Sequence, residues 1–143
     1  MKIKALFSVV VLVVAFAFAG CNSSVETEPG PEETEPGPVD MTLSVLKTGW
    51  YESGHTNYEP VTYNPLEVGD VVYEDDYYEI VIESVTEDMI ILNVDGALIE
   101  PNSDGTINLR ADPIEEIELA AGESIELVSQ TMDAGIQLKI AFE

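Results

Sequence analysis

The sequence predicts an all-β fold, an antiparallel β-sandwich of about seven to nine strands. Short runs in which apolar and polar residues alternate fill residues 41–143, and such alternation is typical of strands that bury one face. Turn-forming residues interrupt these runs about every 8–12 residues, as they do in sandwiches and barrels. We find no clear helical spacing of apolar residues after residue 40.

The first clear strands lie in the middle of the chain. Tyr78, Ile80 and Ile82 alternate with Glu79 and Glu83, and the turn at 86–88 leads into the apolar run 89–94. Asp95-Gly96 is a dipeptide typical of tight hairpins. We therefore expect residues 97–99 to form the second arm of a hairpin with the preceding run.

The next strands are inferred from the turns between them. The polar turn 102–105 precedes an expected strand over residues 106–110. Residues 115–121 contain helix-forming types, but Ile117 and Leu119 alternate with acidic residues, which indicates a strand. A turn at 121–123 then separates this strand from another over residues 125–128.

The alternation of apolar and polar residues is clearest in the last expected strand and weakest in residues 48–65. Apolar residues occupy every second position of 136–142, after the turn 133–135, which places them on one face. Residues 48–65 lack such alternation and are expected to form an irregular, functional loop. The sandwich could be immunoglobulin-like in architecture only, because the Cys-Trp-Cys core of true immunoglobulin domains is absent.

The N-terminus has the layout of a secretory signal. Lys2 and Lys4 precede an uncharged apolar segment, residues 5–19, and small residues lead to Cys21. An uncleaved anchor helix is the alternative, but a spanning helix needs ~20 apolar residues and this run is shorter.

The run Phe18-Ala19-Gly20-Cys21 resembles the lipobox of bacterial lipoproteins, although Phe18 stands where that family usually has an aliphatic residue. The resemblance implies cleavage before Cys21, attachment of lipid to its sulfur, and a protein held on the extracytoplasmic face of a cell membrane. Several acyl chains on one cysteine give a stable anchor without a transmembrane helix.

A repeated acidic segment follows the cysteine. Residues 26–32 and 33–39 carry nearly the same seven-residue unit, rich in Glu, Pro and Gly, a composition typical of extended linkers. We therefore divide the chain into a signal peptide (1–20), a linker with the lipidated cysteine (21–40) and a β-sandwich domain (41–143).

Charge and cysteine content exclude several function classes. The chain has 28 acidic and 5 basic residues, which argues against nucleic acid or anionic lipid as a partner, since both are bound through Lys and Arg. Cys21 is the single cysteine, so disulfides, thiol catalysis and cysteine-ligated metals are not expected.

Catalytic signals are weak. His55 is the single histidine, and no Gly-x-Ser-x-Gly or His-Glu-x-x-His motif is present. His55 with Glu52 and Glu59 would make a poor zinc site, because zinc usually takes several nitrogen or sulfur ligands. We expect a protein that is not an enzyme, and a small carboxylate-dependent hydrolase is the remote alternative.

Two segments suggest calcium, although no cofactor is required. Residues 100–108 resemble the first part of an EF-hand or dockerin loop, but Glu100 replaces the opening Asp and Ala111 occupies the twelfth position. A plain turn explains the same residues. The densest acidic run could form a calcium site between strands, or simply a solvated turn. Its candidate ligands are Asp70, Glu74, Asp75 and Asp76.

The aromatic segment is the best candidate binding surface. Trp50, Tyr51 and Tyr58 lie close together in the irregular stretch, with Tyr63 nearby. Aromatic side chains on loops stack on sugar rings or anchor protein partners. The alternative is that Trp50 fills one end of the core. The sequence thus favours a non-catalytic recognition, adhesion or accessory module with a glycan or protein partner at the cell surface.

Overall fold

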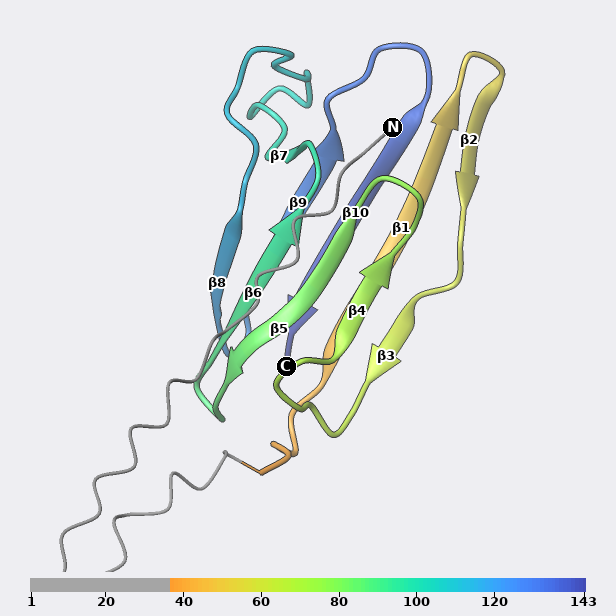
Figure 1. Ribbon diagram of the computed structural model, residues 1–143. Helices are drawn as coiled ribbons and strands as arrows, with labels where there is room; N and C mark the ends of the chain where they lie inside the picture. Colours follow the sequence, from red (N-terminus) through yellow and green to blue (C-terminus); the bar gives the residue numbers. More distant parts are fainter. Residues whose placement is uncertain (1–36) are drawn as a thin grey trace, which may run out of the picture. The chain divides into compact units, whose positions relative to one another are not determined.

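The computed structural model describes residues 37–143, and this part of the chain is all-β. Its ten strands form two antiparallel sheets and no helix, which confirms the predicted β-sandwich (Figure 1). The number of strands is slightly larger than the expected seven to nine, because two short strands form in the segment that lacked alternation.

The larger sheet has six strands and is built around β1, which pairs with β10 along nearly its whole length. Its order is β2-β1-β10-β9-β7, and β3 pairs with the beginning of β1 beside β2. The strands are β1 (Leu43–Tyr51), β2 (Gly54–Asn57), β3 (Val61–Tyr63), β7 (Leu98–Ile99), β9 (Ser124–Ser129) and β10 (Gly135–Phe142).

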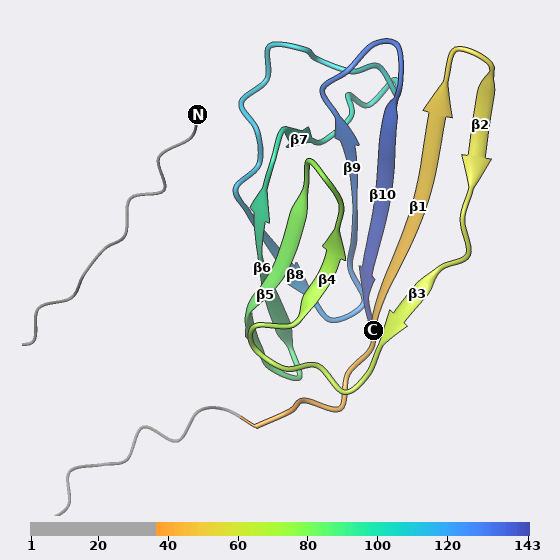
Figure 2. The ribbon, with the colours of Figure 1, turned by 45° about the vertical axis from the view of Figure 1, so that its right-hand side comes forward.

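The smaller sheet has four strands in the order β4-β5-β6-β8 and packs against the larger one (Figure 2). The strands are β4 (Val71–Glu74), β5 (Glu79–Val85), β6 (Met89–Asp95) and β8 (Glu116–Ala120). β8 confirms that residues 117–119 are strand, although they contain helix-forming types.

The core lies between the sheets and follows the period-two pattern. Leu138, Ile140 and Phe142 of β10 are fully buried, and Ile136 is packed at the edge of the core. They meet the inward side chains of the other sheet, such as Ile80 and Leu92. Removal of this apolar surface from water is the main term that stabilises the fold.

The hairpin expected at Asp95-Gly96 is in fact a crossover between the sheets. After Asp95-Gly96 the chain leaves β6 and enters β7, which pairs with β9 of the other sheet. This prediction was wrong because turn residues report local backbone geometry, whereas the burial of the following residues decides which sheet they join. The turn predicted at 121–123 is confirmed, and it also links the two sheets, from β8 to β9.

The predictions for residues 106–110 and 48–65 were also wrong. Residues 106–110 form turns and extended segments rather than a strand. The stretch 48–65 contains the end of β1 and the strands β2 and β3. Since all four residues of β2 are exposed, this edge strand has no buried face, and its sequence has no reason to alternate.

The described residues begin within the predicted linker. Val39 pairs with Leu66 through two backbone hydrogen bonds of 2.9 Å, so the chain joins the fold slightly before residue 41. The lipobox-like signal with Cys21 and most of the acidic repeat lie outside the described residues. Within residues 37–143 no helix is long and apolar enough to span a bilayer.

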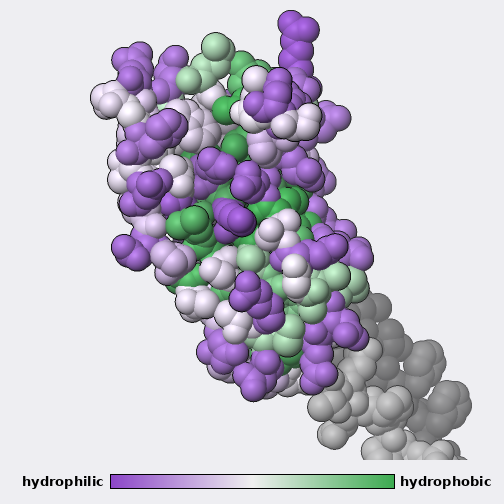
Figure 3. Space-filling view, turned by 180° about the vertical axis from the view of Figure 1, so that it is seen from behind, coloured by the Kyte–Doolittle hydropathy of each residue, from purple (hydrophilic) through white to green (hydrophobic). Residues whose placement is uncertain are grey.

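Several connections gather at one end of the sandwich, the upper end in Figures 1 and 2. They are the β1–β2 turn, the β4–β5 turn, the β9–β10 loop and the long segment between β7 and β8. The surface seen from behind is mostly hydrophilic, with hydrophobic patches between the polar side chains (Figure 3). The gathered connections form the candidate sites.

Candidate functional site

The second half of β1 separates the predicted aromatic residues onto two faces of the larger sheet. Leu43 and Val45 are buried in the core, and alternation along the strand places Lys47, Gly49 and Tyr51 on the same face. Trp50 therefore points to the outer face. The three predicted ligand-binding residues, Trp50, Tyr51 and Tyr58, do not form one site.

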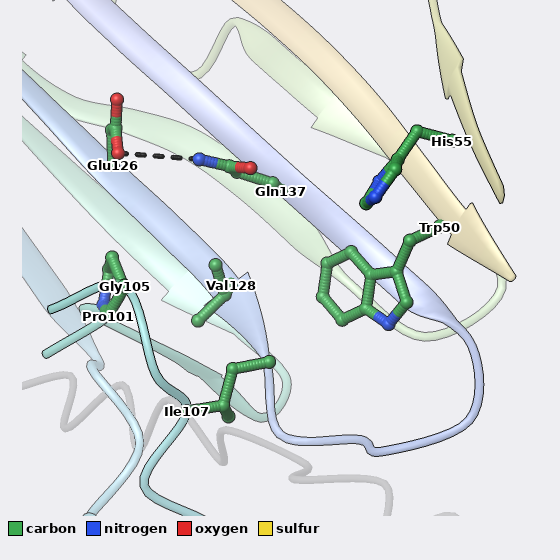
Figure 4. A pocket seen from close by; sticks show the side chains of 8 residues that line it. All are labelled: Trp50, His55, Pro101, Gly105, Ile107, Glu126, Val128 and Gln137. Carbon is green, nitrogen blue, oxygen red and sulfur yellow. Dashed lines mark hydrogen bonds between the residues drawn. The ribbon is translucent and has the colours of Figure 1, made fainter. Parts of the chain in front are cut away.

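On the outer face Trp50 lines a groove of about 400 Å³, which we call the tryptophan groove. Strands β2, β1, β10 and β9 form its floor, and the segment after β7 forms one wall (Figure 4). Its lining residues are Trp50, His55, Pro101, Gly105, Ile107, Glu126, Val128 and Gln137. The alternative prediction, that Trp50 fills the end of the core, is wrong, because Trp50 is not among the residues packed on the core between the sheets.

Gly135 fixes the position of the indole. It lies opposite Trp50 in the pairing of β1 with β10, and a Cβ atom added there would come 2.5 Å from Cζ2 of Trp50 and 2.1 Å from Oγ of Ser129. Contacts this short are not tolerated by close-packed side chains. The absence of a side chain at position 135 thus lets the Trp50 ring approach the β10 backbone.

Polar side chains line the same groove as the indole. His55 lies directly opposite Trp50 across the β1–β2 pair. Nε2 of Gln137 donates a hydrogen bond of 3.3 Å to Oε2 of Glu126, and Figure 4 shows Gln137 between Glu126 and Trp50. The groove therefore combines one aromatic face with imidazole, amide and carboxylate groups that can donate or accept hydrogen bonds.

On the inner face, the end of the sandwich opens into a second hollow of about 440 Å³, which we call the tyrosine cleft. It lies between β1, the β4–β5 turn and the β9–β10 loop. Tyr51, Tyr77 and Tyr78 line it together with Lys47, Asp75, Ile136 and residues of the loop 131–135. Tyr51 and Tyr58 both lie over Gly49, with ring carbons 3.7 and 3.6 Å from where its Cβ would be.

Lys47 links this cleft to a neighbouring hollow of about 390 Å³ that Tyr58 and Tyr73 line. Its Nζ lies 5.4 Å from the ring centre of Tyr58 and 5.2 Å from that of Tyr73. It also forms an ion pair of 3.8 Å with Asp75. An ammonium group over aromatic rings gains cation–π stabilisation, so a charged residue is accommodated at an inward position.

Asp75 holds the β4–β5 turn in place. Its carboxylate accepts hydrogen bonds from the Tyr73 hydroxyl at 2.5 Å and from the backbone N–H groups of Tyr77 and Tyr78 at 2.9 and 3.0 Å. Burial alone would raise the pKa of Asp75, but these hydrogen bonds and Lys47 favour the charged form and lower it below 3.8. Burial, together with the bond to Asp75, raises the pKa of Tyr73.

The predicted calcium ligands are not brought together. Asp70 lies before β4 and accepts a hydrogen bond from the backbone of Glu67, whereas Glu74, Asp75 and Asp76 lie at the other end of that strand. Asp75 is already bonded by the protein's own donors. Within residues 37–143 no group of three or more His, Cys, Asp or Glu side chains is placed to hold a metal ion, and this also applies to His55 with Glu52 and Glu59.

The segment that resembled a calcium loop forms a self-contained turn. Asn102 and Thr106 are joined by backbone and side-chain hydrogen bonds, and Asp104 accepts two more from Thr106. These bonds lower the pKa of Asp104. The plain turn, which was the alternative prediction, explains these residues.

Several residues of the two hollows were missed in the sequence. Lys47 could have been noticed, because it follows Leu43 and Val45 at the next inward position of an alternating run. The Tyr77-Tyr78 pair beside the acidic run was a second signal. Nothing in the sequence pointed to Gln137 and Glu126, since polar residues are normal on the outer face of a strand.

No family model matches the sequence, and comparisons with curated proteins and with solved structures find no match. Function therefore has to be inferred from the residues of the two hollows.

Proposed function

We propose that the protein is a lipid-anchored, extracytoplasmic recognition module that binds a neutral saccharide in the tryptophan groove. The observation that carries the proposal is the grouping of Trp50, His55, Gln137 and Glu126 in one open groove on the sheet surface. The indole supplies an apolar face for the C–H groups of a sugar ring. The polar side chains supply donors and acceptors for its hydroxyl groups.

The charge of the molecule favours a neutral ligand. Lys47, Arg110 and Lys139 are the basic residues of the described range, and none of them lines the groove. Lys139 lies opposite Glu126 in the pairing of β10 with β9, so this cation has a carboxylate of the protein next to it. An anionic polysaccharide would approach Glu126 and a strongly acidic protein with no cation among the lining residues. A neutral saccharide avoids this repulsion.

Binding without catalysis is proposed, because Glu126 is the one carboxylate among the residues that line the groove. Glycoside hydrolysis usually needs two carboxyl groups flanking the scissile bond. Glu126 also accepts the hydrogen bond from Gln137. The groove is therefore better suited to hold a sugar than to cleave one.

The anchor and the stalk belong to the proposal on sequence grounds. The lipobox-like run ending in Cys21 and the acidic repeat that follows it support display of the sandwich away from a membrane. Replacement of Cys21 by Ser should release the protein from the membrane fraction in its native host. A variant that stays membrane-bound would overturn this part and leave the groove proposal untouched.

Affinity electrophoresis in gels that contain a neutral polysaccharide tests the groove. We expect at least one neutral polysaccharide to retard the wild-type protein, and Trp50→Ala to reduce the affinity by at least about tenfold. Trp50→Phe should retain part of the binding because it keeps an aromatic face. Tyr51→Ala, which changes the opposite face of β1, is the matched control and should bind normally. Equal retardation of Trp50→Ala and wild type would refute the proposal.

A further inference from the structure

The tyrosine cleft exposes large side chains that the recognition of a saccharide on the other face does not use. Tyr77 is 79% exposed and Tyr51 is 54% exposed, and both line the same hollow. Met132, which is also 79% exposed, lies in the loop that forms one side of the cleft. Exposed aromatic side chains around one hollow, with an exposed Met in the adjoining loop, are typical of protein-binding surfaces.

The cleft already accommodates one cation of the protein itself. The ammonium group of Lys47, which lines the cleft, lies 5.4 and 5.2 Å from the ring centres of Tyr58 and Tyr73 in the neighbouring hollow and pairs with Asp75. Aromatic faces and a carboxylate at the side of the cleft thus stabilise an ammonium group. Tyr51 and Tyr77 offer further aromatic faces at its mouth that remain open to solvent.

The charge around the mouth has a single sign. An adjoining hollow shares Asp75, Tyr77 and Tyr78 with the cleft. Its remaining lining residues, Glu74, Asp76, Glu79 and Asp95, are exposed acids. Within residues 37–143 the one ion pair is that of Lys47 with Asp75, so these four carboxylates have no cationic partner there. A basic ligand would be complementary to this rim, whereas an acidic ligand would be repelled.

The backbone of the β4–β5 turn that carries Tyr77 and Tyr78 is held in place by the fold rather than by a ligand. Asp75 accepts hydrogen bonds from the backbone N–H groups of both Tyr77 and Tyr78. Gly96 approaches the same turn so closely that a Cβ there would lie 2.6 Å from the carbonyl oxygen of Tyr77, and its φ of 113° favours glycine. A surface that is ordered before binding loses less entropy when a partner docks.

We propose that the tyrosine cleft is a docking site for a Lys- or Arg-rich segment of a partner protein. Cationic side chains of that segment lie against Tyr77 and Tyr51, and the carboxylates of the rim set the preference for positive charge. This site lies on the opposite face of β1 from the tryptophan groove and is independent of saccharide binding.

The probe is a fluorescein-labelled octalysine peptide titrated with the full chain in detergent and followed by fluorescence anisotropy. We expect saturable binding, no binding of an octaglutamate peptide, and a loss of affinity of at least about fivefold for Tyr77→Ala. Tyr77→Phe keeps the aromatic face and should bind nearly as well as the wild-type protein.

A pair of charge variants separates a docking site from general attraction to an acidic protein. Asp76→Asn/Glu79→Gln removes two rim charges, and Glu83→Gln/Glu87→Gln removes two exposed charges along β5 and at its far turn. The first double variant should weaken binding several-fold more than the second. Equal losses in both, together with unchanged binding by Tyr77→Ala, would overturn the proposal. Dimerisation of the wild-type chain that Tyr77→Ala abolishes would assign the cleft to a second copy and would also overturn it.

Discussion

The two halves of β1 use the same inward face for different purposes. In the first half, Leu43 and Val45 are 0% and 4% exposed and belong to the core. In the second half, the same face carries Lys47, Gly49 and Tyr51, and Tyr51 is 54% exposed. One continuous strand, paired with β10 from Leu43 to Trp50, therefore passes from the interior of the sandwich into its open end.

This difference shows how a small domain can present binding groups on rigid backbone. The core half stabilises the strand, and the pairing with β10 extends this order to the residues beyond the core. Side chains on strands are held more precisely than side chains on loops. We expect substitutions in the first half of the strand to change stability, and those in the second half to change binding.

The largest effect is expected in the core. Leu138 is fully buried and lies opposite Lys47 in the pairing of β10 with β1. Leu138→Ala should lower the free energy of unfolding by about 2–5 kcal/mol, because it removes buried apolar surface and leaves a cavity. Urea denaturation measures this value. A loss below about 1 kcal/mol would mean that the core does not extend to this position as described.

A smaller loss of stability is expected at the β4–β5 turn, which carries Tyr77 and Tyr78. Asp75→Asn removes the negative charge that Lys47 faces and weakens the bonds to the β4–β5 turn. We expect it to destabilise the fold by about 1–3 kcal/mol. Asp76→Asn changes the neighbouring exposed residue and is the control, with an effect within about 0.5 kcal/mol. Equal unfolding midpoints in urea for the two variants would contradict the role of Asp75.

Asp75 and its hydrogen-bond partner Tyr73 predict how the stability of the fold depends on pH. The pKa of Asp75 is lower in the fold than its ordinary value of 3.8, so its contribution is present above that value and is lost as the pH falls below it. The pKa of Tyr73 is raised from 10.0, so its contribution is present below pH 10 and is lost at higher pH.

Thermal unfolding as a function of pH tests both statements. Asp75→Asn should weaken the loss of stability in acid relative to the wild type. Tyr73→Phe should weaken the loss above pH 10. Curves for the two variants that run parallel to the wild-type curve at both extremes would show that these side chains do not titrate differently in the folded and unfolded protein.

The smallest effect on stability is expected at the mouth of the cleft. Tyr51 and Tyr77 are exposed, so Tyr51→Ala and Tyr77→Ala should each change the free energy of unfolding by no more than about 0.5 kcal/mol. Urea denaturation of both variants beside Leu138→Ala would sharpen the contrast between the two halves of β1. If Tyr51→Ala lowered the free energy of unfolding as much as Leu138→Ala, the two halves of β1 would not differ in their contribution to stability.

The sequence was sufficient to predict the strands that bury one face. The strands β5, β6 and β10 each bury alternate residues, and alternation is visible without a structure. β2 and β3 were missed because β2 has no buried residue at all. The crossover after β6 was taken for a hairpin, because the pairing partner of a strand depends on residues far away in the sequence.

The candidate sites were only partly predictable for the same reason. The aromatic cluster was found, but alternation within β1 sends Trp50 and Tyr51 to opposite faces. Once the strand is recognised, this separation follows directly. The neighbours of each residue in space do not follow from the sequence, since Gln137 and Glu126 share a groove with Trp50 only through the pairing of β1, β10 and β9.

The central claim, that the groove beside Trp50 binds a neutral saccharide, has a direct reporter in the molecule. Trp50 is the single tryptophan of the chain, so its emission reports on this groove alone. We would titrate the full chain in detergent with soluble oligomers of glucose, xylose and N-acetylglucosamine while recording Trp50 fluorescence. We predict a saturable change in Trp50 fluorescence for at least one of these neutral oligomers, and the same change in the Tyr51→Ala protein. Saccharide binding detected by calorimetry without any change in Trp50 emission would contradict it.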